Sequence, residues 1–480
     1  AAPVWRASIP LDDPAIFLGA SWLRWALPDG TAVDCRPAGG LAPMLDLAGP
    51  CRGARLAVQA GRVSVSLLPP LAPSERTRRG RRLLIEAEFG PLADGILLES
   101  FQGRSGGDSP GAIAADLARR GIGAPLWFSV VDGTVPAPPG TIPLIRGSEE
   151  WFRALRTARV IITNDCLPIW WAKRPGQRVL QTWHGTPIKR LGHDAAPGAT
   201  SLTYLRMIDA QAPQWDLLLA QSRSAEERLR SALGYTGPTW VGEYPRNAPL
   251  TADPRARAAT RRWTRAELGI PDDASVVLLA PTWREELRDG ESSITRLVDA
   301  ERVARETGAV VLLRGHHMNR PALGAPSGDP ELPEAPGAPA GVIDVGDHPS
   351  VESLMLAADI LVTDYSSIIM DFALTGRPAI AHVPDLEDYR HHQGLYGHWP
   401  DDAPWPVTRD DAGLIDELRR LLVGARVSPR RRRPGGGRAS SCQAHPGASA
   451  RLDIPGPGAS ALMTLLPVSL AGGNAPGVMP

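Results

Sequence analysis

The chain has 480 residues, 43% of them hydrophobic, and is therefore long enough for two or three domains. Its 52 basic and 52 acidic residues balance, so the net charge does not favour binding of nucleic acid or another polyanion, and any basic site must be local. No stretch approaches the roughly 18 apolar residues that a membrane-spanning helix needs, and the first residues lack the pattern of a secretory signal. The four cysteines lie far apart and form no CxxC pair. Neither a zinc site nor a disulfide framework is therefore expected, and a reducing cytoplasm is favoured.

Residues 1–90 alternate short apolar runs (ARLAVQA, RVSVSLL and RLLIEAEF) with turn residues, which predicts a small β-rich N-terminal appendage. From residue 91 to 255, strand and helix patterns follow one another. Strands are expected at 95–101, 124–131, 159–165, 178–183 and 216–222, and helices at 110–121, 149–158 and 224–234.

A second alternating series covers residues 256–425, after a link rich in proline and alanine (NAPLTADPRARAAT). Strands are expected at 274–283, 309–317, 359–367 and 377–383, and helices at 301–308, 350–358 and 368–376. Two such series predict two doubly wound α/β domains. Residues 426–480 are dense in proline and glycine and include Arg430 to Arg433. This composition predicts a disordered, solvated tail.

Four expected strands end in polar residues: VLQTW-HGT, VVLLA-PTWR, VVLLR-GHH and ILVT-DYSS. In open α/β sheets, ligands bind beyond the carboxyl ends of the strands. Thr186 can cap a helix that begins at Pro187, and Ser366 or Ser367 can cap a helix that ends at Gly376. Because a helix start offers free N–H groups and a positive dipole end, both places are candidate anion sites.

His184 stands at a strand tip beside Gly185, whose missing side chain permits close approach of the backbone to a ligand. A structural and a functional histidine fit this position equally well. Arg314 and His316 share one face of a strand, as a phosphate site requires, whereas the adjacent His316 and His317 point to opposite faces and do not suit a metal. Asp371 lies one helical turn from the serines and can reach ligand hydroxyls or support the serines.

Some enzyme classes are disfavoured by absent motifs. The strand tips carry neither GxGxxG nor GxxxxGK[ST], which argues against a dinucleotide oxidoreductase and a P-loop NTPase. The stretch GRSGG at 103–107 matches the nucleophile elbow of α/β-hydrolases in form, but no helix pattern begins at Ser105. Two α/β domains with histidines and anion-binding tips instead indicate transfer from a nucleotide-activated donor.

Several motifs together resemble one family. They are LLESFQGRSGGDSPGAI, TND, QTWHGTPIKRLG, EYPRN, LLAPTWR, RGHH, DILVTDYSSIIMDFALTGRPAI and LEDY, spread over roughly residues 95–405. In this order they are similar to the CDP-glycerol glycerophosphotransferase family of teichoic acid polymerases and primases. The resemblance implies a GT-B-like α/β fold in which two Rossmann-like domains face each other across a cleft, residues 91–255 on the acceptor side and residues 256–425 on the CDP-donor side.

The resemblance also implies an activity. Glycerol phosphate, or a related alditol phosphate, would pass from CDP-glycerol to a hydroxyl of a lipid-linked wall-polymer acceptor, with release of CMP and without a metal or cofactor. The protein would work as a peripheral protein at the anionic, cytoplasmic face of the cell membrane. Alternatives are a nucleotide-sugar or sugar-phosphate transferase of capsule or wall glycan, and a catalytically silent nucleotide-binding scaffold.

Site residues follow from the resemblance by motif. His184 would be the general base on the acceptor hydroxyl, a role that the ordinary histidine pKa of about 6.5 suits. His316 would complete the catalytic pair. The substrate-binding positions would be Trp183, Gly185, Thr186, Pro187, Arg246, Pro281, Thr282, Arg314, Gly315, Ser366, Ser367 and Asp371.

Overall fold

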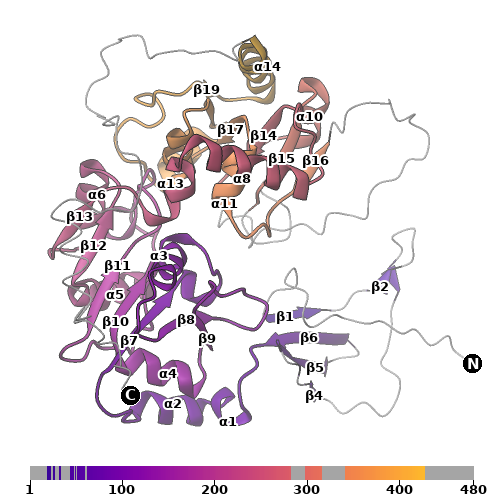
Figure 1. Ribbon diagram of the computed structural model, residues 1–480. Coiled ribbons are helices and arrows are strands. Elements are labelled where there is room, and N and C mark those ends of the chain that lie inside the picture. Colours follow the sequence, from indigo (N-terminus) through magenta and orange to yellow (C-terminus); the bar gives the residue numbers. More distant parts are fainter. Residues whose placement is uncertain are drawn as a thin grey trace, which may run out of the picture. The chain divides into compact units, whose positions relative to one another are not determined.

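The computed structural model describes residues 19–22, 25–26, 32–33, 44–47, 49, 51–59, 62–282, 298–315 and 341–427. Its chain forms a mixed α/β structure with two large parallel sheets (Figure 1). By internal contacts it divides into two compact units. The first comprises the described residues up to Trp183 together with Gln214–Leu218, and the second comprises His184–Pro213 and the described residues from Leu219 onward. The domain boundaries near residues 90, 255 and 425 stay predictions.

The N-terminal segment is β-rich, as expected. Strands β1 (Gly19–Trp22), β6 (Arg62–Leu68), β5 (Gly53–Gln59) and β4 (Met44–Leu47) form an antiparallel sheet in that order. A short ribbon pairs β2 (Trp25–Ala26) with β3 (Ala32–Val33).

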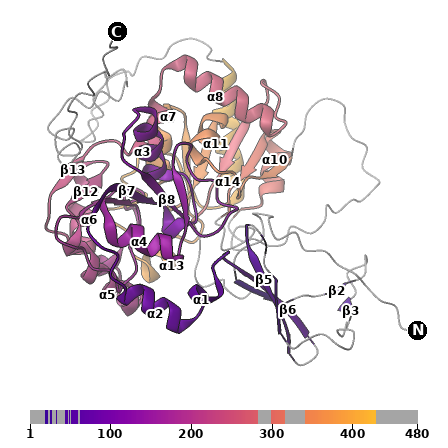
Figure 2. The ribbon, with the colours of Figure 1, turned by 60° about the horizontal axis from the view of Figure 1, so that its bottom comes forward.

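The strand expected in RLLIEAEF is wrong. Most of that run lies in helix α2 (Arg78–Glu86), which follows the short helix α1 (Pro73–Arg76). The hydroxyl of Thr77 accepts a hydrogen bond from the amide of Gly80 at 2.9 Å. This cap satisfies a free N–H group and favours the helix over a strand. Figure 2 shows α2 lying near α4 (Glu149–Thr157).

The seven-stranded sheet has the order β13-β12-β11-β10-β7-β8-β9. From β12 to β9, each strand pairs with its neighbours in the parallel direction. Its strands are β7 (Ala93–Glu99), β8 (Leu126–Val130), β9 (Ile142–Ile145), β10 (Ala158–Thr163), β11 (Arg178–Gln181), β12 (Leu217–Ala220) and β13 (Thr239–Val241). Helices α3 (Asp108–Arg119), α4, α5 (Leu202–Gln211) and α6 (Arg223–Leu233) connect them. All five strands and three helices that the patterns predicted here are present, while α5 had no clear pattern. Helix α3 begins three residues after Ser105, so the stretch GRSGG does not form a nucleophile elbow.

The six-stranded sheet is parallel and has the order β16-β15-β14-β17-β18-β19. Its strands are β14 (Val276–Leu279), β15 (Val310–Leu313), β16 (Val342–Asp344), β17 (Ile360–Thr363), β18 (Ala379–His382) and β19 (Val407–Thr408). Both faces are buried. Along β14, Val276 and Leu278 belong to one apolar cluster, and Val277 and Leu279 belong to the other. This alternation explains why the strand reads as a continuous apolar run.

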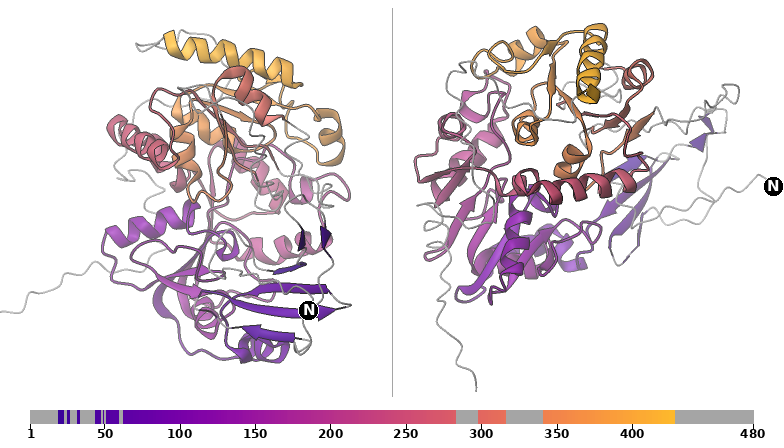
Figure 3. Two further views of the ribbon diagram at one scale, coloured as in Figure 1. Left: turned by 90° about the vertical axis from the view of Figure 1, so that its right-hand side faces the viewer. Right: turned by 45° about the horizontal axis from the view of Figure 1, so that its top comes forward.

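Helices cover both faces of this sheet. They are α8 (Pro254–Glu267), α10 (Ala300–Thr307), α11 (Val351–Ala357), α12 (Ile368–Phe372), α13 (Leu386–His392) and α14 (Asp411–Val427). Helices α10 and α14 pack into the same apolar cluster and are seen near each other in Figure 3. The expected disordered tail lies outside the described residues from position 428 onward.

The link rich in proline and alanine is helical. It contains α7 (Ala248–Thr251) and the first half of α8. The carboxylate of Asp253 accepts hydrogen bonds from the amides of Arg255 and Ala256, and Pro254 occupies the first helical position. A capping aspartate followed by proline is a strong helix start, so local capping explains this element.

Candidate active site

The carboxyl ends of β14 and β17 are joined by one buried carboxylate. Asp364, which follows β17, accepts hydrogen bonds through Oδ1 from the amide and the hydroxyl of Thr282, at 2.8 and 2.6 Å. The same oxygen accepts from the amide of Tyr365 at 2.6 Å. The expected site residues Pro281 and Thr282 are therefore fixed beside the TDYSS motif.

Helix α12 starts at the motif serines. Its first amide, that of Ile368, donates to the hydroxyl of Ser366 at 3.4 Å, and the hydroxyl of Ser367 makes no capping hydrogen bond. The helix passes into a 3₁₀ turn and stops at Gly376 with φ 71°. The predicted helix stop is confirmed. The expected serine cap is present only as the long hydrogen bond that the hydroxyl of Ser366 accepts.

Gly185 packs directly against Ser367. A Cβ atom on Gly185 would lie 2.2 Å from Oγ and 2.9 Å from Cβ of Ser367, and the glycine has φ 152°. Both the space and the backbone conformation therefore demand glycine. The close approach that the sequence predicted is present, and in this structure the side chain of Ser367 fills the space.

The helix expected to begin at Pro187 is absent, so that prediction is wrong. The hydroxyl of Thr186 donates to Oε1 of Gln221 at 2.8 Å and does not cap a helix. Beyond it, Lys189 forms an antiparallel bridge with Leu395, and the amide of Arg190 donates to the carbonyl of Gly394 at 3.0 Å. These pairings keep the segment extended, and one of the two expected helix-start anion sites does not form.

Arg246 and Asp371 form the centre of the site. Nη2 of Arg246 lies 2.7 Å from Oδ2 of Asp371, and Nη1 donates to the backbone carbonyl of His184 at 2.7 Å. Asp371 also accepts, through Oδ1, from Asn247 at 2.7 Å and from Gln221 at 3.1 Å. Asp371 lies one turn below Ser367, as the sequence predicted, and its carboxylate supports the arginine that holds the His184 segment.

Sequence reasoning missed three members of this cluster: Gln221, Glu243 and Asn247. Gln221 follows β12, so the strand-tip rule offered a signal for it. Glu243 and Asn247 are the first and last residues of EYPRN. Burial raises the pKa of the Glu243 carboxyl, and the nearby charge of Asp371 raises it further, while hydrogen bonds from Gln221 and Asn247 oppose the rise. The site therefore holds two carboxyl groups close together.

Arg314 follows β15 and is held by backbone carbonyls. Its Nη1 donates to Val345 at 3.1 Å and to His348 at 3.0 Å. Burial lowers the pKa of Arg314, against the charges of Glu352 and Asp347. Gly315 is the last described residue of this segment, and His316 lies outside the described residues.

Trp183 has a strained backbone at the point where the chain passes from the first unit to the second. Its φ is 53°, its side chain is 3% exposed, and its amide donates to the side chain of Gln181 at 2.9 Å. A left-handed conformation costs a bulky residue free energy, and such residues cluster at functional sites. His184 is the next residue and the first of the second unit.

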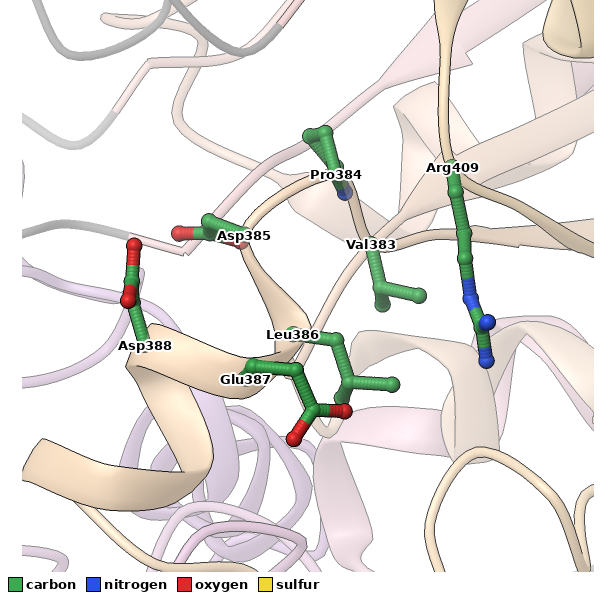
Figure 4. A pocket seen from close by; sticks show the side chains of 7 residues that line it. All are labelled: Val383, Pro384, Asp385, Leu386, Glu387, Asp388 and Arg409. Atoms are coloured by element: carbon green, nitrogen blue, oxygen red, sulfur yellow. The ribbon is translucent and has the colours of Figure 1, made fainter.

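A small pocket of about 170 Å³ lies beyond β18 and β19 (Figure 4). Its lining includes Asp385, Glu387, Asp388 and Arg409. Asp385 accepts a hydrogen bond from the hydroxyl of Tyr365 at 3.0 Å, which connects the pocket wall to the TDYSS motif. Three carboxylates would repel a phosphate, so this pocket does not suit the pyrophosphate of a donor.

Within the described ranges, no three His, Cys, Asp or Glu side chains are grouped closely enough to hold a metal ion. Among the helices that the structure describes, none combines the length and the apolar character needed to cross a membrane.

The family model described as CDP-Glycerol:Poly(glycerophosphate) glycerophosphotransferase matches residues 90–447. The chain is 30% identical over 346 residues to the teichoic acid poly(glycerol phosphate) polymerase of Staphylococcus epidermidis, covering 68% of this chain and 45% of the relative. It is 28% identical over 337 residues to the teichoic acid glycerol-phosphate transferase of Staphylococcus aureus, covering 68% of this chain and 83% of the relative. The match thus spans less than half of the first relative.

A solved structure of the wall teichoic acid polymerase TagF superposes with a TM-score of 0.64 and 28% identity, covering 72% of this chain and 85% of that one. TagF has also been solved as a histidine-to-asparagine variant soaked with CDPG. The two parallel sheets and this likeness confirm the predicted fold class, a GT-B-like α/β fold with Rossmann-like sheets.

Proposed function

Because the chain belongs to the CDP-glycerol:poly(glycerophosphate) glycerophosphotransferase family, we propose that it transfers glycerol phosphate from CDP-glycerol to a hydroxyl of a lipid-linked wall-polymer acceptor and releases CMP. One observation carries this proposal. The residues of three distant motifs, WHGTP, EYPRN and DYSSIIMD, meet in a single cluster around Arg246 and Asp371. These motifs carry the family resemblance, and a shared active site would require them to converge in this way.

His184 is the proposed general base. Its imidazole would take the proton of the acceptor hydroxyl as that oxygen attacks the β-phosphorus of CDP-glycerol. The bond from this phosphorus to the oxygen bridging the two phosphates would break, and CMP would leave with the bonding electrons. The backbone of His184 is fixed by Arg246, which supports such a role because a base must be held within reach of its proton.

The donor phosphates are proposed to lie against the motif serines. The hydroxyls of Ser366 and Ser367 would donate to pyrophosphate oxygens, and Arg314 would add a positive field. Both arginines of the site already bind protein oxygen atoms, Arg246 at Asp371 and Arg314 at two carbonyls. Their proposed contribution is therefore to position residues and to supply charge, with the serines making the closest contacts.

The acceptor sets the proposed location. A lipid-linked acceptor lies at a membrane, so we infer that the protein docks by charge on the anionic cytoplasmic face. Helix α2 supports this inference, because four of its nine residues are arginines and none of its residues is buried. Basic residues near an anionic surface contribute about 1 kcal/mol each.

A panel of donors tests the proposed reaction. The protein is incubated with CDP-glycerol, CDP-ribitol or UDP-sugars in the presence of acceptor, and the released nucleotide is measured. We expect CMP from CDP-glycerol. Release of UDP from a UDP-sugar would instead indicate a glycosyltransferase, and donor binding without any release would indicate a nucleotide-binding scaffold.

A further inference from the structure

Gln221 lies at the carboxyl end of β12 and connects three separate segments of the candidate site. Its Oε1 accepts a hydrogen bond from the hydroxyl of Thr186 at 2.8 Å. Its Nε2 donates to Oδ1 of Asp371 at 3.1 Å and to Oε2 of Glu243 at 3.2 Å. One half-buried amide group therefore connects the WHGTP segment, the EYPRN segment and helix α12.

Only an amide fits this position. Carboxylate oxygens accept hydrogen bonds and cannot donate them, so the NH₂ group must face Asp371 and Glu243 while the oxygen faces Thr186. A glutamate at position 221 would bring a third carboxylate against the other two. A hydrophobic residue would leave the hydroxyl of Thr186 and one acceptor site on each carboxylate without this partner.

The segment that carries His184 is held at two points. Arg246 binds the carbonyl of His184, and Gln221 binds the hydroxyl of Thr186, two residues further on. Both anchors attach to the same carboxylate, that of Asp371. Between the two points lies Gly185, pressed against Ser367. The position of His184 is therefore set by side chains that are 35 residues or more away in sequence.

We propose that Gln221 is a positioning residue for the transfer reaction, holding the 184–186 segment in the geometry in which His184 reaches the acceptor hydroxyl. The proposal rests on the function proposed above. It gives Asp371 the same kind of role, as the common anchor of Arg246 and Gln221.

Three variants at two positions test the proposal. Gln221→Ala and Thr186→Val each remove the hydrogen bond between residues 186 and 221, and Gln221→Glu keeps the shape but cannot donate. We expect kcat to fall roughly 10- to 100-fold in each, because small displacements of a catalytic group have effects of this size. The KM for CDP-glycerol should change little in the two Gln221 variants. Thr186→Ser, which keeps the hydroxyl, should retain most of the activity.

The double variant Thr186→Val with Gln221→Ala should be hardly worse than Gln221→Ala alone, because the hydrogen bond that Thr186→Val removes is already lost in that variant. Gln177→Ala is the matched control. Gln177 is a buried glutamine that, like Gln221, joins separate segments, through the carbonyls of Leu155 and Ala158. It lies in the first unit, and its loss should lower the melting temperature without lowering kcat of the folded protein.

A measurement that needs no turnover separates the positioning role of Gln221 from the proposed transfer reaction. The NMR chemical shifts of the His184 ring, assigned by comparison with His184→Ala, should change in Gln221→Ala and not in Gln177→Ala. Unchanged His184 chemical shifts together with an unchanged kcat would overturn the role of Gln221. A wild-type protein that releases no nucleotide, with His184 chemical shifts that still depend on Gln221, would overturn the proposed reaction and leave the positioning role standing.

Discussion

Arg246 and Asp371 form an ion pair inside the protein, with 2.7 Å between Nη2 and Oδ2 and with 7% and 4% of the two side chains exposed. The arginine belongs to EYPRN and the aspartate to the helix after TDYSS, 125 residues apart. A buried charge pair of this kind is costly to break, because the remaining partner keeps its charge without water. The pair therefore fixes both motifs relative to the His184 carbonyl.

Removing one partner should destabilise the protein strongly. We expect Arg246→Met to lower the free energy of unfolding by roughly 3–5 kcal/mol, and Arg246→Met with Asp371→Leu to recover part of this loss. Denaturant unfolding measures both. The matched control is Arg82→Ala, since the pair of Arg82 with Glu86 is exposed and its loss should have no measurable effect. Equal effects of the two arginine substitutions would contradict the account.

Gly185→Ala should abolish turnover, because the new Cβ would meet the hydroxyl of Ser367 at 2.2 Å. Adding Ser367→Gly should restore more activity than adding Ser367→Ala, since Cβ of residue 367 would remain at 2.9 Å. Gly234→Ala is the control. Gly234 also has a positive φ, 60°, but nothing lies within 4 Å of its added Cβ. This variant should lose some stability and keep its kcat. Full activity in Gly185→Ala would show that the close contact is not required.

Sequence patterns predicted much of the fold because the central strands of the two sheets carry local apolar runs, whereas the short strands β9, β13, β16 and β19 were not predicted. They predicted part of the site for a related reason: the carboxyl ends of parallel strands lie on one edge of a sheet, so His184, Thr282 and Asp364 were recognisable as strand tips. The helix at Pro187 was wrong because the Thr186 hydroxyl is used by Gln221. That bond spans 35 residues, and no local periodicity encodes it.

Titration of Glu243 should lower stability as the pH rises. Burial raises the pKa of its carboxyl in the folded protein, so the folded state favours the protonated form. The stabilisation that this raised pKa gives the folded protein is fully present below about pH 4.3, the pKa of a glutamate in the unfolded chain. It is lost as the pH rises through the pKa that Glu243 has in the folded protein. Glu243→Gln should therefore melt higher than the wild type at neutral pH, with a smaller difference in acid.

Glu226 provides a control of opposite sign. Burial would raise the pKa of Glu226, but hydrogen bonds from Thr239 and Arg223 outweigh it and the pKa is lowered. Its stabilising contribution is present above the unfolded pKa and is lost in acid. Glu226→Gln should thus melt lower than the wild type at neutral pH. If both variants shifted in the same direction, the environment assigned to Glu243 would be wrong.

Docking by charge predicts sedimentation with anionic vesicles that weakens as salt is added. Binding should largely survive removal of residues 426–480. It should weaken when Arg78, Arg79 and Arg81, three exposed residues of α2, are changed to alanine. Neutral vesicles serve as the control. A protein that ignored anionic vesicles at low salt would have to reach its acceptor through a membrane partner.

The most direct test of the central claim follows the glycerol phosphate itself. CDP-glycerol labelled in the glycerol group is incubated with a lipid-linked acceptor, and both the CMP released and the label transferred are measured. We predict equal amounts of the two in the wild type and a loss of both by roughly 10²–10⁴ in His184→Ala, with donor affinity largely retained. Near-normal transfer by His184→Ala, or CMP release without transfer of label, would contradict the account.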